Sequence, residues 1–168
     1  NAALKSKRRK LALLAEELPK ADWKSFGKEF TGFDFIPYGI PNPSTDNLGE
    51  KFHKMFVISP FLSKGVIEGF AKNRLTNPDC TLITRKSELH KLDGELLTAF
   101  DTYTIKDDVA DGEQHISETG EYKTQDIHAK VYLRTKWSDS ELYIGSANAS
   151  YNAFHGGNVE CMIALWGK

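Results

Sequence analysis

Two nearly continuous apolar runs, separated by a helical pattern, constrain the fold of this chain more than any other feature. The runs span residues 54–59 and 80–84, and Pro60 closes the first. Apolar runs of this length are typical of strands that are buried on both faces of a sheet. Residues 63–74 carry apolar side chains at helical spacing, so we expect a helix between the two strands.

The same order continues beyond the second strand. Ser87 can cap a second helix whose apolar positions reach Phe100, with Gly94 as a weak point within it. Residues 100–105 then form a third predicted strand. A β-α-β-α-β order predicts an α/β domain with a mixed, largely parallel sheet flanked by helices. We place this domain at residues 51–168.

Residues 1–50 are predicted to form an N-terminal extension of this domain. Leucines at helical spacing indicate a helix over residues 3–18, which Pro19 ends. The basic run at residues 5–10 is typical of a solvated helix end, with phosphate contact and targeting as alternatives. Residues 22–40 are rich in aromatic side chains and predict a turn and a short strand that cover one sheet edge. We interpret the chain as an excised domain, in which this extension could be the remnant of an upstream segment.

The composition is that of an ordinary globular domain and excludes several classes of protein. The 168 residues are 40% hydrophobic and 27% charged, with a formal net charge of −1, so no global basic field is present. No apolar run reaches the roughly 18 residues of a membrane span, and no signal-peptide pattern opens the chain. Cys80 and Cys161 lie in apolar runs, which predicts small buried side chains in a reducing cytoplasm and no disulfide or zinc site.

The stretch from Asp126 to Leu133 is the most informative part of the sequence. Its residues alternate in polarity, so we expect His128, Lys130 and Tyr132 on one face of a strand. The apolar face, which we expect to be buried, consists of Ile127, Ala129, Val131 and Leu133. Residues two apart on a strand project to the same side with Cα atoms about 7 Å apart. His128 and Lys130 are therefore predicted to lie side by side on a rigid element.

A hairpin is predicted to bring further polar side chains to this pair. Residues 142–146 form the next predicted strand, and residues 137–140 form the turn before it. This hairpin would place Ser146 and Asn148 at a strand end beside the His128 strand. A last apolar strand follows, and it carries Glu160.

Taken in order, these residues resemble the motif of the phospholipase D superfamily, His-x-Lys-x4-Asp-x6-Gly-Ser-x-Asn. The matching residues are His128, Lys130, Ser146, Asn148 and Glu160. Two features depart from the motif: Thr135 replaces its Asp, and the spacing to the Gly-Ser pair is three residues longer, which a longer hairpin turn absorbs. The runs at 59–62 and 84–87 are also similar to the family, so the resemblance covers residues 53–166, a bacterial type of phospholipase D-like domain.

The resemblance implies phosphodiester hydrolysis through a covalent phosphohistidine intermediate, with no metal ion or cofactor. Neutral His128 would attack phosphorus, and Glu160 would fix the tautomer and orientation of its ring. Lys130 and Asn148 would bind the non-bridging oxygens, and Ser146 would support that network. We expect the Glu160 carboxylate to lie within roughly 2.6–3.2 Å of a ring nitrogen of His128.

The final strand gives two further expectations. Val159, Cys161 and Ile163 are predicted to point into the core, on the face opposite Glu160. The pocket of His128 is expected to be open on one side, because family sites hold two His-x-Lys motifs and this chain has one. A homodimer partner, or sequence missing from the chain, would supply the second motif.

Three functions are compatible with the sequence. The leading one is a nuclease acting on DNA or RNA, in bacterial defence or restriction. A phospholipase or phospholipid transferase would share the chemistry, but it predicts apolar loop tips, and the loops at 41–50 and 106–125 are polar. The third is a non-catalytic nucleic-acid-binding or dimerisation module with the same fold, which Thr135 leaves open. Residues 106–125 precede the His128 strand and could border the site, as could His155.

Overall fold

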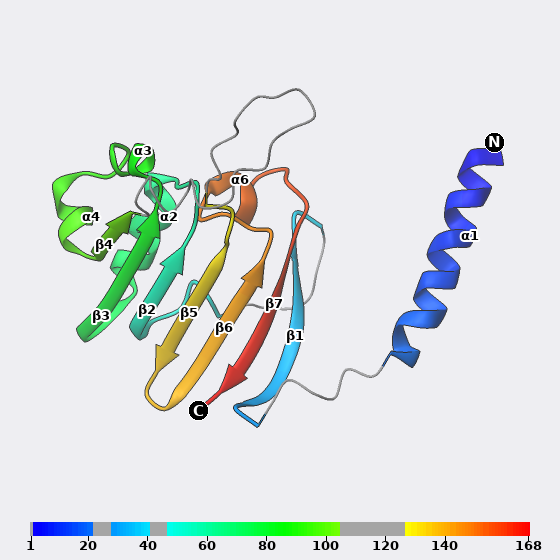
Figure 1. The fold of residues 1–168 in the computed structure, drawn as a ribbon, viewed down its shortest axis with the longest axis horizontal. Helices are drawn as coiled ribbons and strands as arrows, with labels where there is room; N and C mark the ends of the chain where they lie inside the picture. The colour runs from blue at the N-terminus through cyan, green and yellow to red at the C-terminus, as the bar shows by residue number, and fades with distance from the viewer. Residues whose placement is uncertain (1, 22–27, 41–46, 105–126) are drawn as a thin grey trace, which may run out of the picture.

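A seven-stranded mixed sheet forms the centre of the fold (Figure 1). The computed structural model describes residues 2–21, 28–40, 47–104 and 127–168. The strands are β1 (Phe30–Tyr38), β2 (Phe52–Ile58), β3 (Arg74–Thr84), β4 (Asp101–Thr104), β5 (Val131–Lys136), β6 (Asp139–Gly145) and β7 (Glu160–Gly167). They lie side by side in the order β1-β7-β6-β5-β2-β3-β4. The predicted strand of the aromatic-rich extension is β1, which pairs with β7 at one edge of this same sheet.

Helices occupy the predicted connections after β2 and β3, and a further helix, which the sequence did not predict, lies between β6 and β7. They are α1 (Ala2–Glu17), the 3₁₀ turn η1 (Leu18–Lys20), α2 (Lys64–Lys72), α3 (Lys86–Leu89), α4 (Gly94–Thr98) and α6 (Tyr151–Phe154). The prediction of α1 and α2 is confirmed to within two residues at each end. The predicted turn at 22–27 and the polar segment at 106–125 lie outside the described residues, as do residues 41–46.

The α/β class is confirmed, but the sheet is less parallel than predicted. Strands β2, β3 and β4 run parallel, as the β-α-β-α-β order requires. The other four pairings are antiparallel. A longer connection that contains α6 joins β6 to β7, whereas a tight turn joins β5 to β6. Short connections of this kind favour antiparallel neighbours. The C-terminal hairpin therefore adds an antiparallel half to a parallel one.

The single helix predicted after Ser87 is wrong, because two short helices take its place. Helix α3 ends at Leu89, and α4 begins after Asp93. The Asp93 carboxylate accepts a hydrogen bond from the Leu96 backbone N–H at 3.1 Å and so caps a new helix. Gly94, predicted to be a weak point, is the first residue of that second helix.

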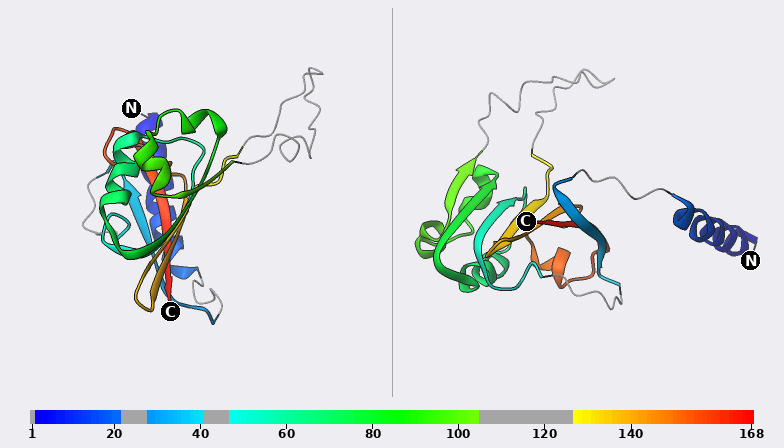
Figure 2. Two further views of the ribbon diagram at one scale, coloured as in Figure 1. Left: turned by 90° about the vertical axis from the view of Figure 1, so that its left-hand side faces the viewer. Right: turned by 90° about the horizontal axis from the view of Figure 1, so that it is seen from below.

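The helices α2 and α6 cover one face of the sheet, and the main core lies between them and the strands (Figure 2). Tyr132 of β5 is fully buried there, and its ring contacts the rings of Phe70 from α2 and Phe154 from α6. Met55, Val57, Leu82 and Met162 on neighbouring strands are likewise almost completely buried. The opposite face of the sheet has no covering helix among the described residues.

A buried charge stabilises the base of the C-terminal hairpin. Arg134 of β5 is only 4% exposed, and its guanidinium donates to Glu141 at 3.1 Å and to the backbone oxygen of Lys51 at 2.9 Å. On the same hairpin, the hydroxyls of Thr135 and Ser140 lie 3.0 Å apart across the two strands. Thr135, which replaces the motif Asp, thus forms a hydrogen bond with Ser140 on the neighbouring strand.

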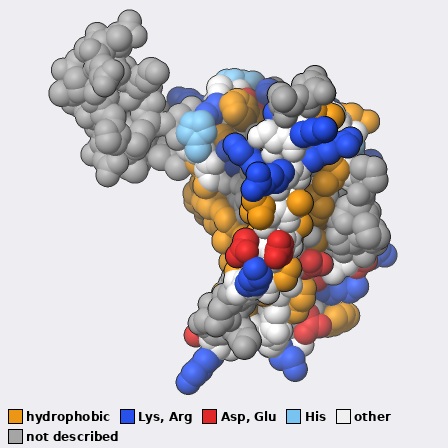
Figure 3. All heavy atoms as spheres, turned by 90° about the vertical axis from the view of Figure 1, so that its right-hand side faces the viewer, with side chains coloured by type: hydrophobic (Ala, Val, Ile, Leu, Met, Phe, Trp, Pro, Cys, Tyr) orange, Lys and Arg blue, Asp and Glu red, His pale blue; other side chains and the backbone are white. Residues whose placement is uncertain are grey.

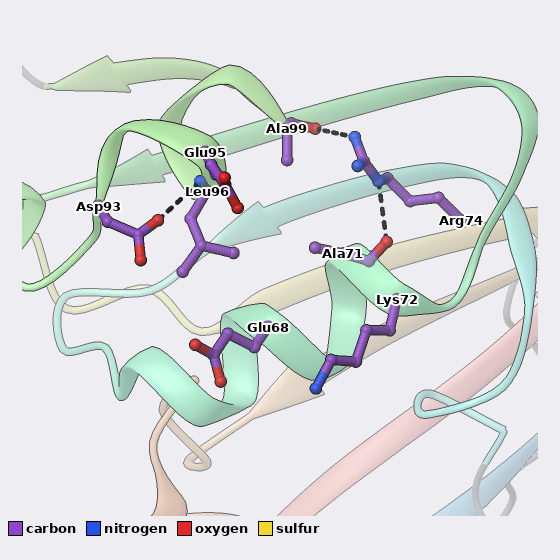
Figure 4. Close-up of a pocket in the computed structure, with 8 residues that line it drawn as sticks. All are labelled: Glu68, Ala71, Lys72, Arg74, Asp93, Glu95, Leu96 and Ala99. Atoms are coloured by element: carbon purple, nitrogen blue, oxygen red, sulfur yellow. Dashed lines mark hydrogen bonds between the residues drawn. The ribbon is translucent and has the colours of Figure 1, made fainter.

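A hollow of about 350 Å³ lies between α2 and α4, next to the start of β3 (Figure 4). Arg74 spans part of it, donating to the backbone oxygens of Ala71 and Ala99, both at 2.9 Å. Asp93 at its rim caps α4 and forms an ion pair with Lys64 at 2.9 Å. These polar groups serve the packing of the two helices. The hollow lies near Arg74, at the start of β3. The motif residues gather at the other end of this strand, where Thr84 lies.

No helix among the described residues is long and apolar enough to cross a membrane.

Replacing Leu82 by alanine should test the core on the covered face of the sheet. Leu82 is 0% exposed, so the substitution is expected to lower the free energy of unfolding by about 2–5 kcal/mol through lost burial and a residual cavity. Leu13→Ala, at a half-exposed position of α1, is the control and should change it by less than about 0.5 kcal/mol. Urea unfolding measures both, and equal losses would contradict the assignment of the core.

Candidate active site

The sheet topology brings the motif residues to one end of the sheet. At this end β2, β3 and β6 finish, whereas β5 and β7 begin. Lys130 precedes β5 directly, Ser146 follows β6, and Glu160 is the first residue of β7. The backbone N–H of Gly145 donates to the Lys130 oxygen at 3.3 Å, which fixes the start of β5 against the end of β6. Three segments far apart in the sequence thus contribute side chains to one edge.

His128 and Lys130 lie in the segment that leads into β5 and not on the strand, which corrects the prediction. The His128 side chain is exposed, and Lys130 is half-buried. The Lys130 ammonium donates to the backbone oxygen of His128 at 2.6 Å, so the two residues do lie side by side. The Lys130 ammonium is therefore held against the backbone of His128.

The predicted burial of the two faces of this strand is reversed. Tyr132, which shares a face with His128 and Lys130, is fully buried, whereas Leu133 on the predicted buried face is 37% exposed. The reason is that α2 and α6 pack over the Tyr132 side. His128 and Lys130 thus continue the covered face beyond the end of the strand.

The loop at residues 146–150 is anchored through its backbone to buried groups. The Tyr132 hydroxyl donates to the Ala147 oxygen at 2.8 Å, and the Ala149 N–H donates to the Ser59 hydroxyl at 2.9 Å. Ala147 and Ala149 are both 0% exposed. Asn148 lies between these two fixed points, so its position is set by its neighbours. Its amide oxygen is buried and has no hydrogen-bond partner among the described atoms.

The segments that follow β2 and β3 hold this loop in place through hydrogen bonds. The Thr84 hydroxyl donates to the Ser59 backbone oxygen at 2.7 Å, and the Ser63 N–H donates to the Ala149 oxygen at 2.8 Å. The buried Glu88 carboxylate accepts from the Leu62 N–H at 2.7 Å. These runs, which the sequence likened to the family, hold the loop in place.

Glu160 is bonded to residues other than His128. One carboxylate oxygen accepts a short hydrogen bond from the Ser146 hydroxyl, and the other accepts from the Asn158 side-chain amide at 3.3 Å. The Ser146 oxygen also accepts from the Cys161 N–H at 3.0 Å. No hydrogen bond joins Glu160 to His128 in the described structure, so the predicted direct contact is wrong for this arrangement. Ser146 instead links the Glu160 carboxylate to the loop that carries Asn148.

The predicted burial on β7 is also reversed. Met162 and Ala164, on the Glu160 side, are buried in the core, whereas Val159 is 70% exposed and Cys161 is exposed. Cys80 is buried, as predicted. The cause is the same as on β5, because the covered face carries Glu160, Met162 and Ala164.

Burial dominates the chemistry of the Tyr132 hydroxyl. Its removal from water raises the pKa of Tyr132 above its ordinary value of 10.0, and the negative charge of Glu160 raises it further. The phenol therefore stays protonated and remains a hydrogen-bond donor to the Ala147 oxygen. The sequence did not identify Tyr132, Ser59 or Glu88 as supports of the site. The signals for Ser59 were its place at the end of an apolar run and the similarity of residues 59–62 to the family.

An apolar groove of about 690 Å³ lies between α2 and α6 on the covered side of the sheet. Tyr151, Phe154 and His155 form one wall. The described residues that line this groove include none of the motif residues, so it stays a prediction that His155 borders the His128 site. Among the described residues, no group of three His, Cys, Asp or Glu side chains is arranged to hold a metal ion.

Removing the Tyr132 hydroxyl should change how stability depends on pH. The unfolded phenol ionises near pH 10 and the folded one at higher pH, so wild-type stability falls as pH rises through 10. This contribution amounts to about 1.4 kcal/mol per pH unit above 10. Tyr132→Phe lacks it, and its stability deficit of about 1 kcal/mol at pH 8 should disappear near pH 11. Urea unfolding at both pH values measures this, and a constant deficit would contradict it.

The sequence matches no family model, and no curated protein matches it. Its structure is similar to that of Nuc from Salmonella typhimurium, a phospholipase D family member, at 12% identity and a TM-score of 0.45, over 81% of this chain and 83% of Nuc. It is similar to NucT from Helicobacter pylori at 13% identity and a TM-score of 0.44, over 80% and 86%. A yeast tyrosyl-DNA phosphodiesterase mutant gives 10% identity and a TM-score of 0.46, over 79% of this chain and 31% of the enzyme.

Proposed function

We propose that the chain is a phosphodiesterase of the phospholipase D superfamily, and specifically a nuclease acting on DNA or RNA. The observation that carries the proposal is the meeting of the motif side chains at one sheet end. Three separate segments bring them there. The exposed side chain of His128 is accessible to a substrate phosphate, and the Lys130 ammonium is bonded to the backbone oxygen of the same residue. A nucleophile beside a fixed cation suits attack on an anionic phosphodiester.

In the proposed reaction, a neutral ring nitrogen of His128 forms a bond to phosphorus while the bond to the leaving oxygen breaks. The leaving oxygen takes a proton from a general acid. Water then attacks the phosphohistidine, which releases the phosphate monoester and restores the imidazole. Lys130 and the Asn148 amide hold the negative non-bridging oxygens throughout, so no metal ion or cofactor is needed for that task.

Glu160 remains the proposed orienting carboxylate, with Ser146 as its support. Both of its oxygens are engaged, one by Ser146 and one by the Asn158 amide. The Asn158 bond, at 3.3 Å, is the longer and weaker of the two. We propose that Glu160 exchanges this bond for one to the His128 ring when substrate binds. A carboxylate in that position fixes the tautomer and stabilises the imidazolium.

The general acid is proposed to come from a second His-x-Lys motif. This chain has one such motif, so a homodimer partner or a second phospholipase D-like half in a longer protein would supply the other. General-acid help is worth roughly 10²- to 10⁴-fold, so a substrate with a poor leaving group depends on it. We further propose a cytoplasmic location and a role in bacterial defence or restriction.

A non-catalytic binding module is the second candidate. The observation that favours it is the position of Glu160, whose carboxylate is bonded to Ser146 and Asn158 in place of His128. A module of this kind would keep the cation of Lys130 for phosphate contact without turnover. The kinetic test of His128 separates the two functions.

His128→Ala should abolish phosphodiester hydrolysis, because it removes the nucleophile. The expected loss exceeds about 10⁴-fold, the scale found when a covalent nucleophile is deleted. The assay uses bis-p-nitrophenyl phosphate, whose leaving group needs little protonation, and single-stranded DNA. The matched control is His90→Ala, an exposed histidine on the α3 side of the sheet, which should keep wild-type turnover. Equal rates for wild type and His128→Ala would refute the mechanism.

Hydrolysis should be insensitive to EDTA, because Lys130 and Asn148 perform the charge stabilisation proposed here. Rates are measured on the same two substrates before and after chelation and after addition of Mg²⁺. We expect all three rates to agree within about twofold. Loss of activity in EDTA and its return with Mg²⁺ would point to a metal-assisted reaction instead.

A further inference from the structure

The face of the sheet opposite the covered one carries two apolar rows that cross the strands; we call it the open face. Strand pairing places the first row across five strands, through Phe33, Leu165, Leu142, Leu133 and Phe56. The second row runs through Phe35, Ile163, Ile144, Val131, Ile58 and Ile83. Neighbours in each row are paired across adjacent strands, so the rows form one continuous apolar surface.

This surface is accessible in the described structure. Phe35 is 41% exposed, Leu133 37% and Ile144 45%, although the adjacent strands shield the flanks of each side chain. An antiparallel sheet can leave one face in water, but that face then normally carries polar side chains, whereas these rows are apolar. A contiguous apolar surface of this width indicates a site of association. The open face therefore requires a partner that supplies apolar side chains.

The chain itself contains an apolar surface of matching form on α1. Leu4, Leu11 and Leu14 recur at intervals of seven and three residues, which places them along one side of the helix, and Leu18 follows four residues later as the first residue of η1. All four are about half-exposed, at 47–65%. Lys7 lies within this leucine stripe, and its flexible stem can lie along apolar surface while its ammonium stays in water. The other charged residues of the basic run lie beside or behind the stripe.

The dimensions of the two surfaces agree. Helix α1 has 16 residues and is thus about 24 Å long. The five strands of the first row span about 19 Å from the first to the last, at a spacing of about 4.8 Å. One helix can therefore contact both apolar rows. Helices that cover sheet faces make contacts of this kind in layered folds.

In the structure, α1 does not cover the open face of its own chain. Figure 1 shows α1 beyond the β1 edge, standing away from its own sheet, and the second view in Figure 2 agrees. Seen from the α1 side in Figure 3, Lys and Arg side chains gather in the upper part of the molecule and Asp and Glu lower down. An extended helical arm with an apolar side is a suitable element for exchange between identical chains.

We propose that the leucine stripe of α1 packs on the open face of a second copy of this chain, and that the second copy returns the same contact. The reciprocal exchange gives a two-fold dimer in which both exposed apolar surfaces are buried. The charged side of α1 stays in water. This inference concerns assembly and stands whether or not the chain hydrolyses phosphodiesters.

The native Cys161 provides a direct test, because it is exposed on the open face next to Ile163, whereas Cys80 is buried. One copy carries Leu14→Cys with Cys161→Ser, so its only reactive thiol is on α1. Mixed with wild type and a flexible bis-maleimide, it should give a cross-linked species of twice the monomer mass. A second variant, Leu11→Cys with Cys161→Ser, repeats the test at another point of the stripe. We call these two variants, whose reactive thiol is on α1, the arm copies.

Controls separate the alternatives. Each arm copy alone and wild type alone should remain monomeric on denaturing gels, and a product from the arm copy alone would show helix-to-helix pairing instead. Leu14→Cys with Cys161 retained reports packing within one chain, as a monomer that migrates anomalously and resists alkylation. That product without an interchain one would overturn the proposal, and so would the absence of any cross-link from both arm copies.

The mass of the native protein gives an independent measurement. Light scattering should show a dimer of the 18.9 kDa chain for wild type and a monomer for Leu11→Lys/Leu14→Lys. Ile144→Lys on the open face should have the same effect. The matched controls are Leu13→Lys on the other side of α1 and Trp137→Lys at the exposed hairpin turn, which should remain dimeric. A monomeric wild type, or equal dissociation by control and test variants, would contradict the exchange.

Discussion

The hydrogen bonds that Tyr132 and Ser59 make to the backbone of residues 147–149 are the interactions on which the site depends. They join the start of β5 and the end of β2 to the loop after β6. Because the two hydroxyls and both loop alanines are buried, water cannot replace these bonds. Asn148 and Ser146 are thereby held at a fixed distance from the segment that carries His128 and Lys130. The catalytic proposal is a consequence of this anchoring.

The charged groups of the site are arranged around that fixed loop. Glu160 is bonded through Ser146 to the loop, while the Lys130 ammonium is bonded to the His128 backbone. A phosphate that enters would meet one cation and one amide, with a carboxylate on the far side of Ser146. The exposure of His128 leaves room for substrate and for a second motif. The same exposed end is accessible from a second copy of the chain.

The sequence predicted the elements well and their orientation poorly. The apolar runs of β2 and β3 specify strands that are buried on both faces, whatever their register. The parallel half of the sheet could therefore be predicted from these runs. On β5, Val131 and Leu133 form the more apolar face, so alternation predicted the wrong face to be buried. The buried Tyr132 and Arg134 decide which face is covered, because each finds a hydrogen-bond partner that comes from another segment. The bond from Ser146 to Glu160 likewise depends on strand pairing that no local pattern reveals.

Trapping of the covalent intermediate is the most direct test of phosphohistidine formation at His128. Bis-p-nitrophenyl phosphate releases its first p-nitrophenol with little need for a general acid, so the step depends on His128 rather than on a second motif. The protein is mixed with this substrate, denatured at alkaline pH to preserve phosphohistidine, digested, and sequenced by mass spectrometry. We expect a p-nitrophenyl phosphoryl adduct on His128 during turnover. An adduct on another residue, or no adduct on His128, would contradict it.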